Sequence, residues 1–269
     1  MDTPRTVVTI DEYSLATCPI EMRFNGTLLS NGTAFVWELD GKLFLITNWH
    51  NVSGRNPNTD KHLSPTAAEP NLLRIRFNNP TNFGHNTGEV ELRTADGGAI
   101  WLVHPIQKRK VDVVAIPLLG QLPTDVIRPI NKMSSLDRLL VGIGMDVFII
   151  GYPFAVEDVG LPVWKRGSIA SEPGLSPAAT PYLLVDTASR PGMSGSPVVM
   201  RSWGTHTLIP DRSTGAVAET QVTVGAATKF IGVYSGRLHT KDPLDAQLGM
   251  VWPSVFIEEI IKGGSKEYG

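Results

Sequence analysis

The sequence predicts an all-β fold, because short apolar segments recur along its 269 residues with turn signals between them. The composition agrees, since 26 glycines and 20 prolines suit a chain that is rich in turns. Few strand signals cross residues 121–140, so we expect two halves, at 1–125 and 141–269, joined by a linker at 126–140. The number of segments is consistent with six strands in each half, arranged as a barrel or a sandwich.

The clearest local signal in the N-terminal half is an Asp-Gly pair at residues 40–41. Alternating apolar residues flank this pair at 33–39 and 42–46, a pattern that predicts a β-hairpin. An Asn-Gly pair at residues 31–32 predicts a further turn just before the hairpin. His50 follows the second strand directly, so we expect the end of a rigid element to aim its side chain.

The C-terminal half is expected to contain further strands and one helix. Apolar runs predict strands at 147–153, 163–169, 182–186, 197–200 and 222–234. The apolar spacing becomes helical at about 253–262, with a proline near the start and two glycines after the last turn. Residues 202–221 show little pattern and are expected to form an insertion, and a short helical turn is expected at 134–140.

The overall charge excludes some classes of function. There are 24 basic and 26 acidic side chains, so the net charge of −2 gives no sign of a nucleic-acid-binding surface. No apolar run approaches the length of a membrane span, and the first twenty residues lack the pattern of a signal peptide. Cys18 is the single cysteine, which excludes an intrachain disulfide and favours a reducing compartment. We therefore expect a cytoplasmic protein that binds neither nucleic acid nor membrane.

Three polar residues stand at the edges of predicted strands, in the order His50, Asp112, Ser194. Ser194 lies in a turn, GMSGSP at residues 192–197, whose glycines let the backbone come close to a ligand. Asp112 lies near the start of an apolar run at 110–118, where an unpaired charge is costly to bury. Each residue alone is more often structural, but the three together predict nucleophilic catalysis.

The chemistry explains why these residue types are needed. Serine is a weak nucleophile at neutral pH, and histidine, whose ordinary pKa is near neutrality, can take its proton. A carboxylate on the other ring nitrogen fixes the tautomer and stabilises the imidazolium. Backbone N–H groups of Gly192 and Ser194 would stabilise the developing oxyanion.

The remaining histidines have no comparable setting and are interpreted as structural or surface residues. They are His62, His85, His104, His206 and His239. No group of His, Cys and Asp has the spacing of metal ligands, so we expect neither a metal ion nor another cofactor.

Residues 192–197 resemble the nucleophile turn of the chymotrypsin/trypsin superfamily of serine proteases. TNWHNV at 47–52 is similar to the histidine box of that superfamily, and VDVVA at 111–115 to its aspartate strand. Further similarity to bacterial HtrA-like and glutamyl-endopeptidase-like members is found in GTAFV at 32–36, GYP at 151–153 and GSI at 167–169. The likeness extends from about residue 20 to residue 262.

The resemblance implies two perpendicular six-stranded antiparallel β-barrels, with the active site in the cleft between them and a short helix at the end. The first barrel would contribute His50 and Asp112, and the second would contribute Ser194 and the oxyanion hole. The implied activity is that of a serine endopeptidase that hydrolyses polypeptides through an acyl-enzyme intermediate.

Some positions depart from the pattern of the superfamily. Met193 stands where trypsin-type enzymes have the aspartate that pairs with a newly cut N-terminus, so that mode of activation is not expected. Ser196 replaces the second glycine of the common motif. HtrA-type proteins continue into a peptide-binding PDZ domain, which we do not expect here.

The resemblance also implies which residues form the pocket for the substrate side chain. Its floor lies six residues before the serine, at Ala188, beside Ser189. Its wall is expected at Tyr234, Ser235 and Gly236. No carboxylate occupies the floor position, so cleavage after lysine or arginine is not favoured. The hypothesis is a preference for small or medium uncharged side chains.

Three other interpretations compete with an active serine endopeptidase. An α/β-hydrolase would need glycine where Ser196 stands, helices between its strands and a histidine after the serine, so the sequence excludes it. A protease fold that binds peptides without hydrolysing them, or that needs a regulatory protein partner to order its oxyanion turn, stays open.

Overall fold

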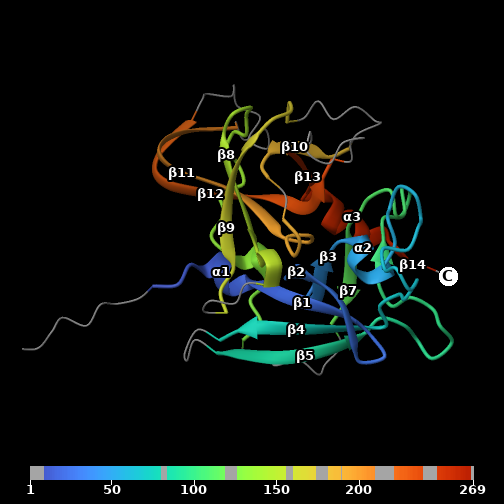
Figure 1. The fold of residues 1–269 in the computed structure, drawn as a ribbon. Coiled ribbons are helices and arrows are strands. Elements are labelled where there is room, and N and C mark those ends of the chain that lie inside the picture. Colours follow the sequence, from blue (N-terminus) through green and yellow to red (C-terminus); the bar gives the residue numbers. More distant parts are fainter. Residues whose placement is uncertain are drawn as a thin grey trace, which may run out of the picture.

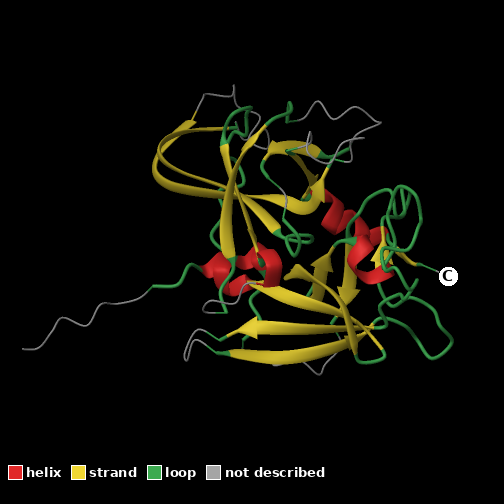
Figure 2. Ribbon diagram, in the orientation of Figure 1, coloured by secondary structure: helices red, strands yellow, loops and turns green. Residues whose placement is uncertain are grey.

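The structure is a computed structural model that describes residues 9–79, 84–118, 126–155, 160–173, 181–188, 190–209, 221–238 and 247–267. Strands dominate, and the helices are short (Figure 2). The strands form two groups that meet along one side of each, one from the N-terminal and one from the C-terminal half of the chain (Figure 1). The predicted all-β class is therefore confirmed.

The N-terminal half forms one antiparallel sheet of eight strands in the order β14-β6-β7-β3-β2-β1-β4-β5. The strands are β1 (Thr17–Phe24), β2 (Thr27–Leu39), β3 (Lys42–Thr47), β4 (Leu72–Asn78), β5 (His85–Glu91), β6 (Leu102–Val103), β7 (Val114–Pro117) and β14 (Ser265–Lys266). Six strands were predicted in this half. The count is higher because two-residue strands are included, and because β14 comes from the end of the chain and pairs with β6.

The C-terminal half forms a closed barrel of six strands in the order β10-β13-β12-β11-β8-β9. The strands are β8 (Asp146–Gly151), β9 (Val163–Ile169), β10 (Leu183–Asp186), β11 (Pro197–Leu208), β12 (Gln221–Arg237) and β13 (Leu248–Pro253). Pairing of β9 with β10 closes the barrel. This half thus has the predicted six strands.

Three α-helices are present in the described part of the chain: α1 (Glu12–Ala16), α2 (Trp49–Ser53) and α3 (Val255–Gly263), with 3₁₀ turns at η1 (Ile130–Lys132) and η2 (Pro153–Ala155). Helix α3 matches the one expected at about 253–262. It buries Phe256, Ile257 and Ile260 in a core that also contains Phe35 of the N-terminal sheet and Val233 of the C-terminal barrel. Within the described ranges, no helix has the length and apolar character needed to cross a bilayer.

The predicted hairpin around Asp40 and Gly41 is present between β2 and β3, and both residues have positive φ (50° and 72°), as a tight hairpin turn requires. The turn predicted at residues 31–32 is wrong, because β2 runs through it without a break. An ideal Cβ on Gly32 would lie 2.9 Å from Asn51 Nδ2, so this glycine allows a close approach of that side chain.

Two other local expectations are also corrected. The segment 202–221 is not an insertion throughout, because β11 continues to Leu208 and β12 begins at Gln221; residues 210–220 lie outside the described residues. No helix forms at 134–140, where the structure has a single hydrogen-bonded turn in which Leu139 N donates to Leu136 O at 2.9 Å. The backbone of this segment also pairs with the barrel, since Leu136 N donates to Thr228 O (2.7 Å) and Leu140 N to Thr207 O (3.1 Å).

Candidate active site

His50 lies on helix α2, which starts two residues after the end of the buried strand β3. The helix ends after one turn at Gly54, whose positive φ of 68° lets its N–H donate to His50 O. The His50 side chain is half-buried and its Nδ1 lies 2.7 Å from Asp112 Oδ2. The backbone N–H of His50 donates to the other carboxylate oxygen, Oδ1, at 3.0 Å. His50 is therefore held by both its ring and its backbone.

Asp112 is only 3% exposed, and its carboxylate is fully engaged. It accepts a third hydrogen bond from the hydroxyl of Ser235 on β12, at 2.5 Å. Asn48 Nδ2 donates to its backbone carbonyl at 2.7 Å. Because a carboxylate can only accept, the proton of His50 sits on Nδ1, which leaves the lone pair on Nε2 available as a base.

Ser194 lies in a turn that depends on glycine at two positions. Gly192 and Gly195 have φ of 91° and 86°, a backbone region that other residues rarely adopt. An ideal Cβ on Gly195 would lie 2.0 Å from Thr33 O, and one on Gly192 would lie 2.2 Å from Tyr152 O. The turn therefore packs directly on backbone, with no room for a side chain at either glycine.

Thr33 on β2 attaches this turn to the N-terminal sheet. Its N–H donates to Ser194 O at 2.8 Å, and its hydroxyl donates to Gly192 O, also at 2.8 Å. Asn51 Nδ2 makes a longer contact to Ser194 O, at 3.3 Å. The candidate nucleophile thus belongs to one half of the molecule but is fixed by residues of the other half.

The carbonyl groups near Ser194 show how the turn is oriented. Pro191 O accepts from Phe154 N at 2.9 Å, which directs this carbonyl toward the GYP segment. The N–H of a trans peptide points away from its carbonyl, so the N–H of Gly192 points away from Phe154. Among the described residues, it donates to none.

The peptide bond between Met193 and Ser194 is oriented by a hydrogen bond to its carbonyl in the same way. Met193 O accepts from Ser196 N at 3.1 Å, so the N–H of Ser194 points away from Ser196. In the described ranges this N–H has no protein acceptor either. The two backbone donors predicted for the oxyanion are therefore unused.

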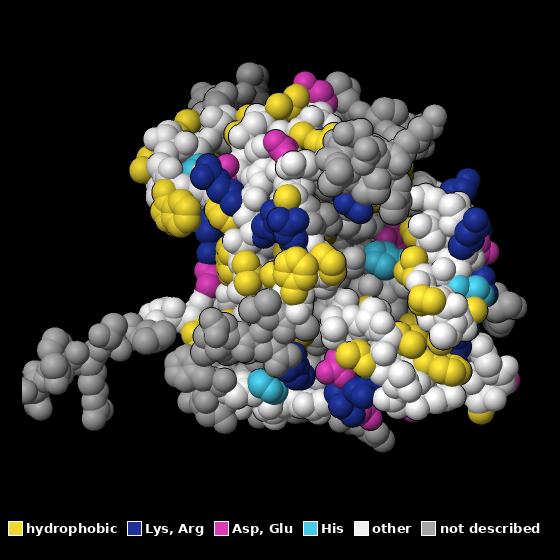
Figure 3. Space-filling view, viewed as in Figure 1, with side chains coloured by type: hydrophobic (Ala, Val, Ile, Leu, Met, Phe, Trp, Pro, Cys, Tyr) yellow, Lys and Arg dark blue, Asp and Glu magenta, His cyan; other side chains and the backbone are white. Residues whose placement is uncertain are grey.

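The structure brings His50, Asp112 and Ser194 together, because all three line one pocket of about 250 Å³. Ser235, Gly236 and other residues of both halves complete this serine pocket, which lies where the two halves meet. In Figure 3 a hollow is visible between the two halves. No hydrogen bond joins Ser194 Oγ to His50 Nε2, a contact that commonly tightens only with substrate bound.

The predicted substrate-pocket residues divide between two pockets. Ser235 and Gly236 line the serine pocket. Ala188 and Tyr234 line a second, narrow pocket with Met193, which precedes the serine and is itself 1% exposed. We call this second pocket the Lys165 pocket, after its charged residue. Ser189 lies outside the described residues.

The other histidines take no part in this site as far as the structure describes them. His104 is buried and its Nε2 lies 2.9 Å from Glu259 Oε2, while His62 is near Glu69. His85 is exposed, and His239 lies outside the described residues. No group of three or more His, Cys, Asp or Glu side chains is placed to hold a metal ion within the described ranges.

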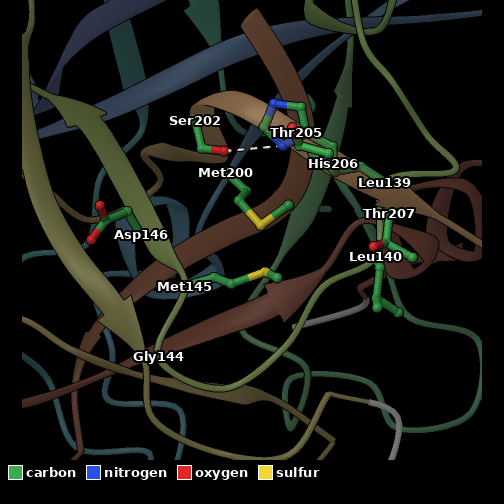
Figure 4. Close-up of a pocket in the computed structure, with 10 residues that line it drawn as sticks. All are labelled: Leu139, Leu140, Gly144, Met145, Asp146, Met200, Ser202, Thr205, His206 and Thr207. Carbon is green, nitrogen blue, oxygen red and sulfur yellow. Dashed lines mark hydrogen bonds between the residues drawn. The ribbon is translucent and has the colours of Figure 1, made fainter. Parts of the chain in front are cut away.

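A larger pocket of about 350 Å³ lies on the C-terminal barrel and shares no residue with the serine pocket. Two methionines, Met145 and Met200, line it together with His206 (Figure 4). His206 Nδ1 contacts Ser202 Oγ at 3.3 Å and its Nε2 contacts Gly225 O at 3.0 Å, so both of its ring nitrogens are engaged within the barrel.

Sequence reasoning missed several residues that build the site. It assigned no role to Thr33, Asn51 or Phe154, which fix the serine turn, and it did not include Lys165 in a pocket. Thr33 lies within the segment 32–36 that resembles the superfamily, and this likeness was the available signal. Lys165 gave none, because a lysine on a strand is usually a surface residue.

A histidine bound to a buried aspartate, facing a serine in a glycine-rich turn between two antiparallel β halves, defines the class of trypsin-like proteins. A family model described as "Trypsin-like peptidase domain" matches residues 32–204, which is more than half of the 269 residues. The chain therefore belongs to the trypsin-like peptidase family, and the predicted resemblance is confirmed.

One of the similar solved structures supports the fold. The serine endoprotease from Yersinia pestis is similar with a TM-score of 0.50 and 14% sequence identity, over 96% of this chain and 70% of that one. Deg5 is similar with a TM-score of 0.48 and 16% identity, over 91% of this chain and 86% of that one. None of the curated proteins compared with the chain matches it.

Proposed function

We propose that this protein is a serine endopeptidase in which Ser194 is the nucleophile, His50 the general base and Asp112 the residue that orients His50. The observation that supports it most is the hydrogen bonding around His50. Its Nδ1–H is committed to Asp112 at 2.7 Å, so Nε2 is left to act as the base, and His50 lines the same pocket as Ser194. The family of the chain supports the same class of reaction.

In the proposed reaction, Ser194 Oγ attacks the carbonyl carbon of the substrate while its proton passes to His50 Nε2. The oxyanion accepts hydrogen bonds from the N–H groups of Gly192 and Ser194. His50 then gives its proton to the leaving amine, and an ester of Ser194 is formed. Water, deprotonated by the same nitrogen, attacks this ester and releases the acid.

Two features of the site, one in the serine turn and one at Asp112, favour a site that is ready for this reaction. The carbonyls of Pro191 and Met193 bond to Phe154 N and Ser196 N, so neither occupies the space expected for the oxyanion. A backbone donor in that space contributes about 10²–10³ in rate. The carboxylate of Asp112 is held by three hydrogen bonds, which lowers the cost of keeping its charge buried.

The size of the substrate side chain follows from the Lys165 pocket. We call the residue whose carbonyl is attacked the primary residue. This pocket is narrow, and the buried side chains of Met193 and Tyr234 are part of its lining. That supports a preference for small or medium side chains, and the absence of a carboxylate among the described lining residues disfavours lysine and arginine.

A fluorophosphonate probe tests the proposal, because it reacts with an activated serine. We expect the wild type to be labelled at Ser194, and Ser194→Ala to lose the label completely. Ser196→Ala is the matched control. Its hydroxyl is buried two residues further on and has no hydrogen-bond partner in the described structure, so this variant should keep the label.

Two other results would contradict the proposal in different ways. A wild type that is not labelled, yet binds peptides, would favour a silent protease-fold module. A wild type that becomes labelled only after a second protein is added would favour a partner-activated protease. Labelling of Ser194→Ala at the wild-type rate would mean that the nucleophile has been assigned to the wrong residue.

A further inference from the structure

The Lys165 pocket lies next to the candidate nucleophile. Met193, which lines it, is the residue before Ser194, and Tyr234 lines it while the next residue, Ser235, lines the serine pocket. Strand β12 is thus a common wall of both pockets. A substrate whose carbonyl reaches Ser194 would present the side chain of its primary residue to the Lys165 pocket.

An aromatic ring lines the pocket and is packed against the barrel. An ideal Cβ on Gly249 of β13 would lie 2.5 Å from a ring carbon of Tyr234, so the ring packs closely against this glycine. Tyr234 is 1% exposed. The buried ring therefore limits the size of the side chain that the pocket can accept.

Lys165 extends from strand β9 into this pocket. Its ammonium donates to the hydroxyl of Thr187 at 3.0 Å. Within the described ranges, no Asp or Glu lies within ion-pair distance of Lys165 Nζ, whereas Arg23, Arg55 and Arg166 each pair with a carboxylate. A hydroxyl is a poor substitute for a carboxylate, because it bears no charge.

The surroundings of Lys165 disfavour its positive charge. Burial lowers the pKa of the Lys165 ammonium, and the positive charge of Arg190, which lines the same pocket, lowers it further. Keeping a partly desolvated cation without a counterion has a free-energy cost, and an incoming anion would remove that cost. A further cation, Arg237, lines the adjoining serine pocket.

We propose that the Lys165 pocket selects substrates with an acidic primary residue, whose carboxylate binds the ammonium of Lys165 beside Thr187. This proposal rests on the proposed function. It changes the hypothesis of an uncharged side chain, which considered only the floor and wall positions and left out β9. Because the pocket is narrow, aspartate is expected to fit better than glutamate.

Peptide libraries with one fixed primary residue test the proposal. We expect the wild type to cleave the aspartate library about tenfold faster, in kcat/KM, than the library with the isosteric neutral asparagine. Lys165→Met, which keeps the length of the side chain and removes its charge, should bring the ratio of aspartate to asparagine close to one. Lys165→Glu should reverse the preference in favour of a lysine library.

The alanine library and the fluorophosphonate probe separate the possible failures. If the probe labels Ser194 and the alanine library is cleaved, but aspartate has no advantage over asparagine, this inference is wrong and the proposed function stands. The same holds if Lys165→Met leaves the ratio unchanged. If the probe does not label Ser194 and no library is cleaved, the proposed function fails and this inference fails with it.

Discussion

The two halves of the molecule hold their parts of the candidate site by different means. In the N-terminal half, a side chain holds the catalytic candidate in place, since the carboxylate of Asp112 accepts hydrogen bonds from the ring and the backbone of His50. In the C-terminal half, the backbone holds the turn of Ser194, through hydrogen bonds to its carbonyl groups and two glycines of positive φ. The first half is therefore sensitive to a change of charge or hydrogen bonding, and the second to an added carbon atom.

Each half also makes hydrogen bonds to the part of the site that the other half contributes. Ser235 of the C-terminal barrel donates to Asp112, and Thr33 of the N-terminal sheet donates to Gly192 O. Both contacts join residues more than a hundred positions apart in the chain. The site can form only when the halves have docked, so its geometry is a property of the interface between them.

Asp112→Asn should have the largest effect on the side-chain half. An asparagine of the same shape cannot accept from His50 Nδ1 with a full negative charge, and its amide can stabilise the wrong tautomer. We expect the rate of fluorophosphonate labelling to fall by about 10⁴. Thermal unfolding is the control for folding. A fall in labelling of less than tenfold would show that Asp112 has only a structural role.

Gly195→Ala tests the backbone half in a corresponding way. Its Cβ would lie 2.0 Å from Thr33 O, so the turn has to move and displace the N–H of Ser194. We expect labelling to slow by about 10²–10³, the usual value of one oxyanion donor.

Gly26→Ala is the matched control for that variant, because Gly26 has a similar φ of 82° but no atom within 4 Å of its ideal Cβ. Both variants should lose about 1–3 kcal/mol of stability from backbone strain. Equal labelling rates for the two variants would refute the claim that contact with Thr33 positions the serine.

Local chemistry explains why part of this site could be predicted from the sequence. The hairpin at Asp40 and Gly41 and the helix at Val255–Gly263 depend on neighbouring residues, so their signals are local. His50 and Ser194 were found because each lies in a short motif. The turn predicted at residues 31–32 was wrong because Gly32 is needed for the approach of Asn51, a contact that sequence spacing does not reveal.

The contacts between the halves could not be predicted either, because they join residues that are far apart in the sequence. The likeness of residues 32–36 to the superfamily draws attention to Thr33, but those residues do not indicate that its hydroxyl contacts Gly192, 159 positions further on. Lys165 likewise reaches Thr187 across neighbouring strands of the barrel. Residues whose role depends on long-range packing are invisible to periodicity and to local motifs, although they decide the shape of the pocket.

Thr33→Val tests the anchor between the halves and should have the smallest effect. The substitution keeps the shape and the backbone contacts of Thr33, but it removes the hydroxyl that donates to Gly192 O at 2.8 Å and accepts from Tyr152 N at 3.2 Å. Both backbone groups then lose this hydrogen bond, which should lower the free energy of unfolding by about 1–3 kcal/mol. Labelling should slow by about tenfold, because the turn can relax while both oxyanion donors stay in place. Thr33→Ser restores the hydroxyl and should return labelling to nearly the wild-type rate, and if it labels as slowly as Thr33→Val, packing of the methyl group would be the cause instead.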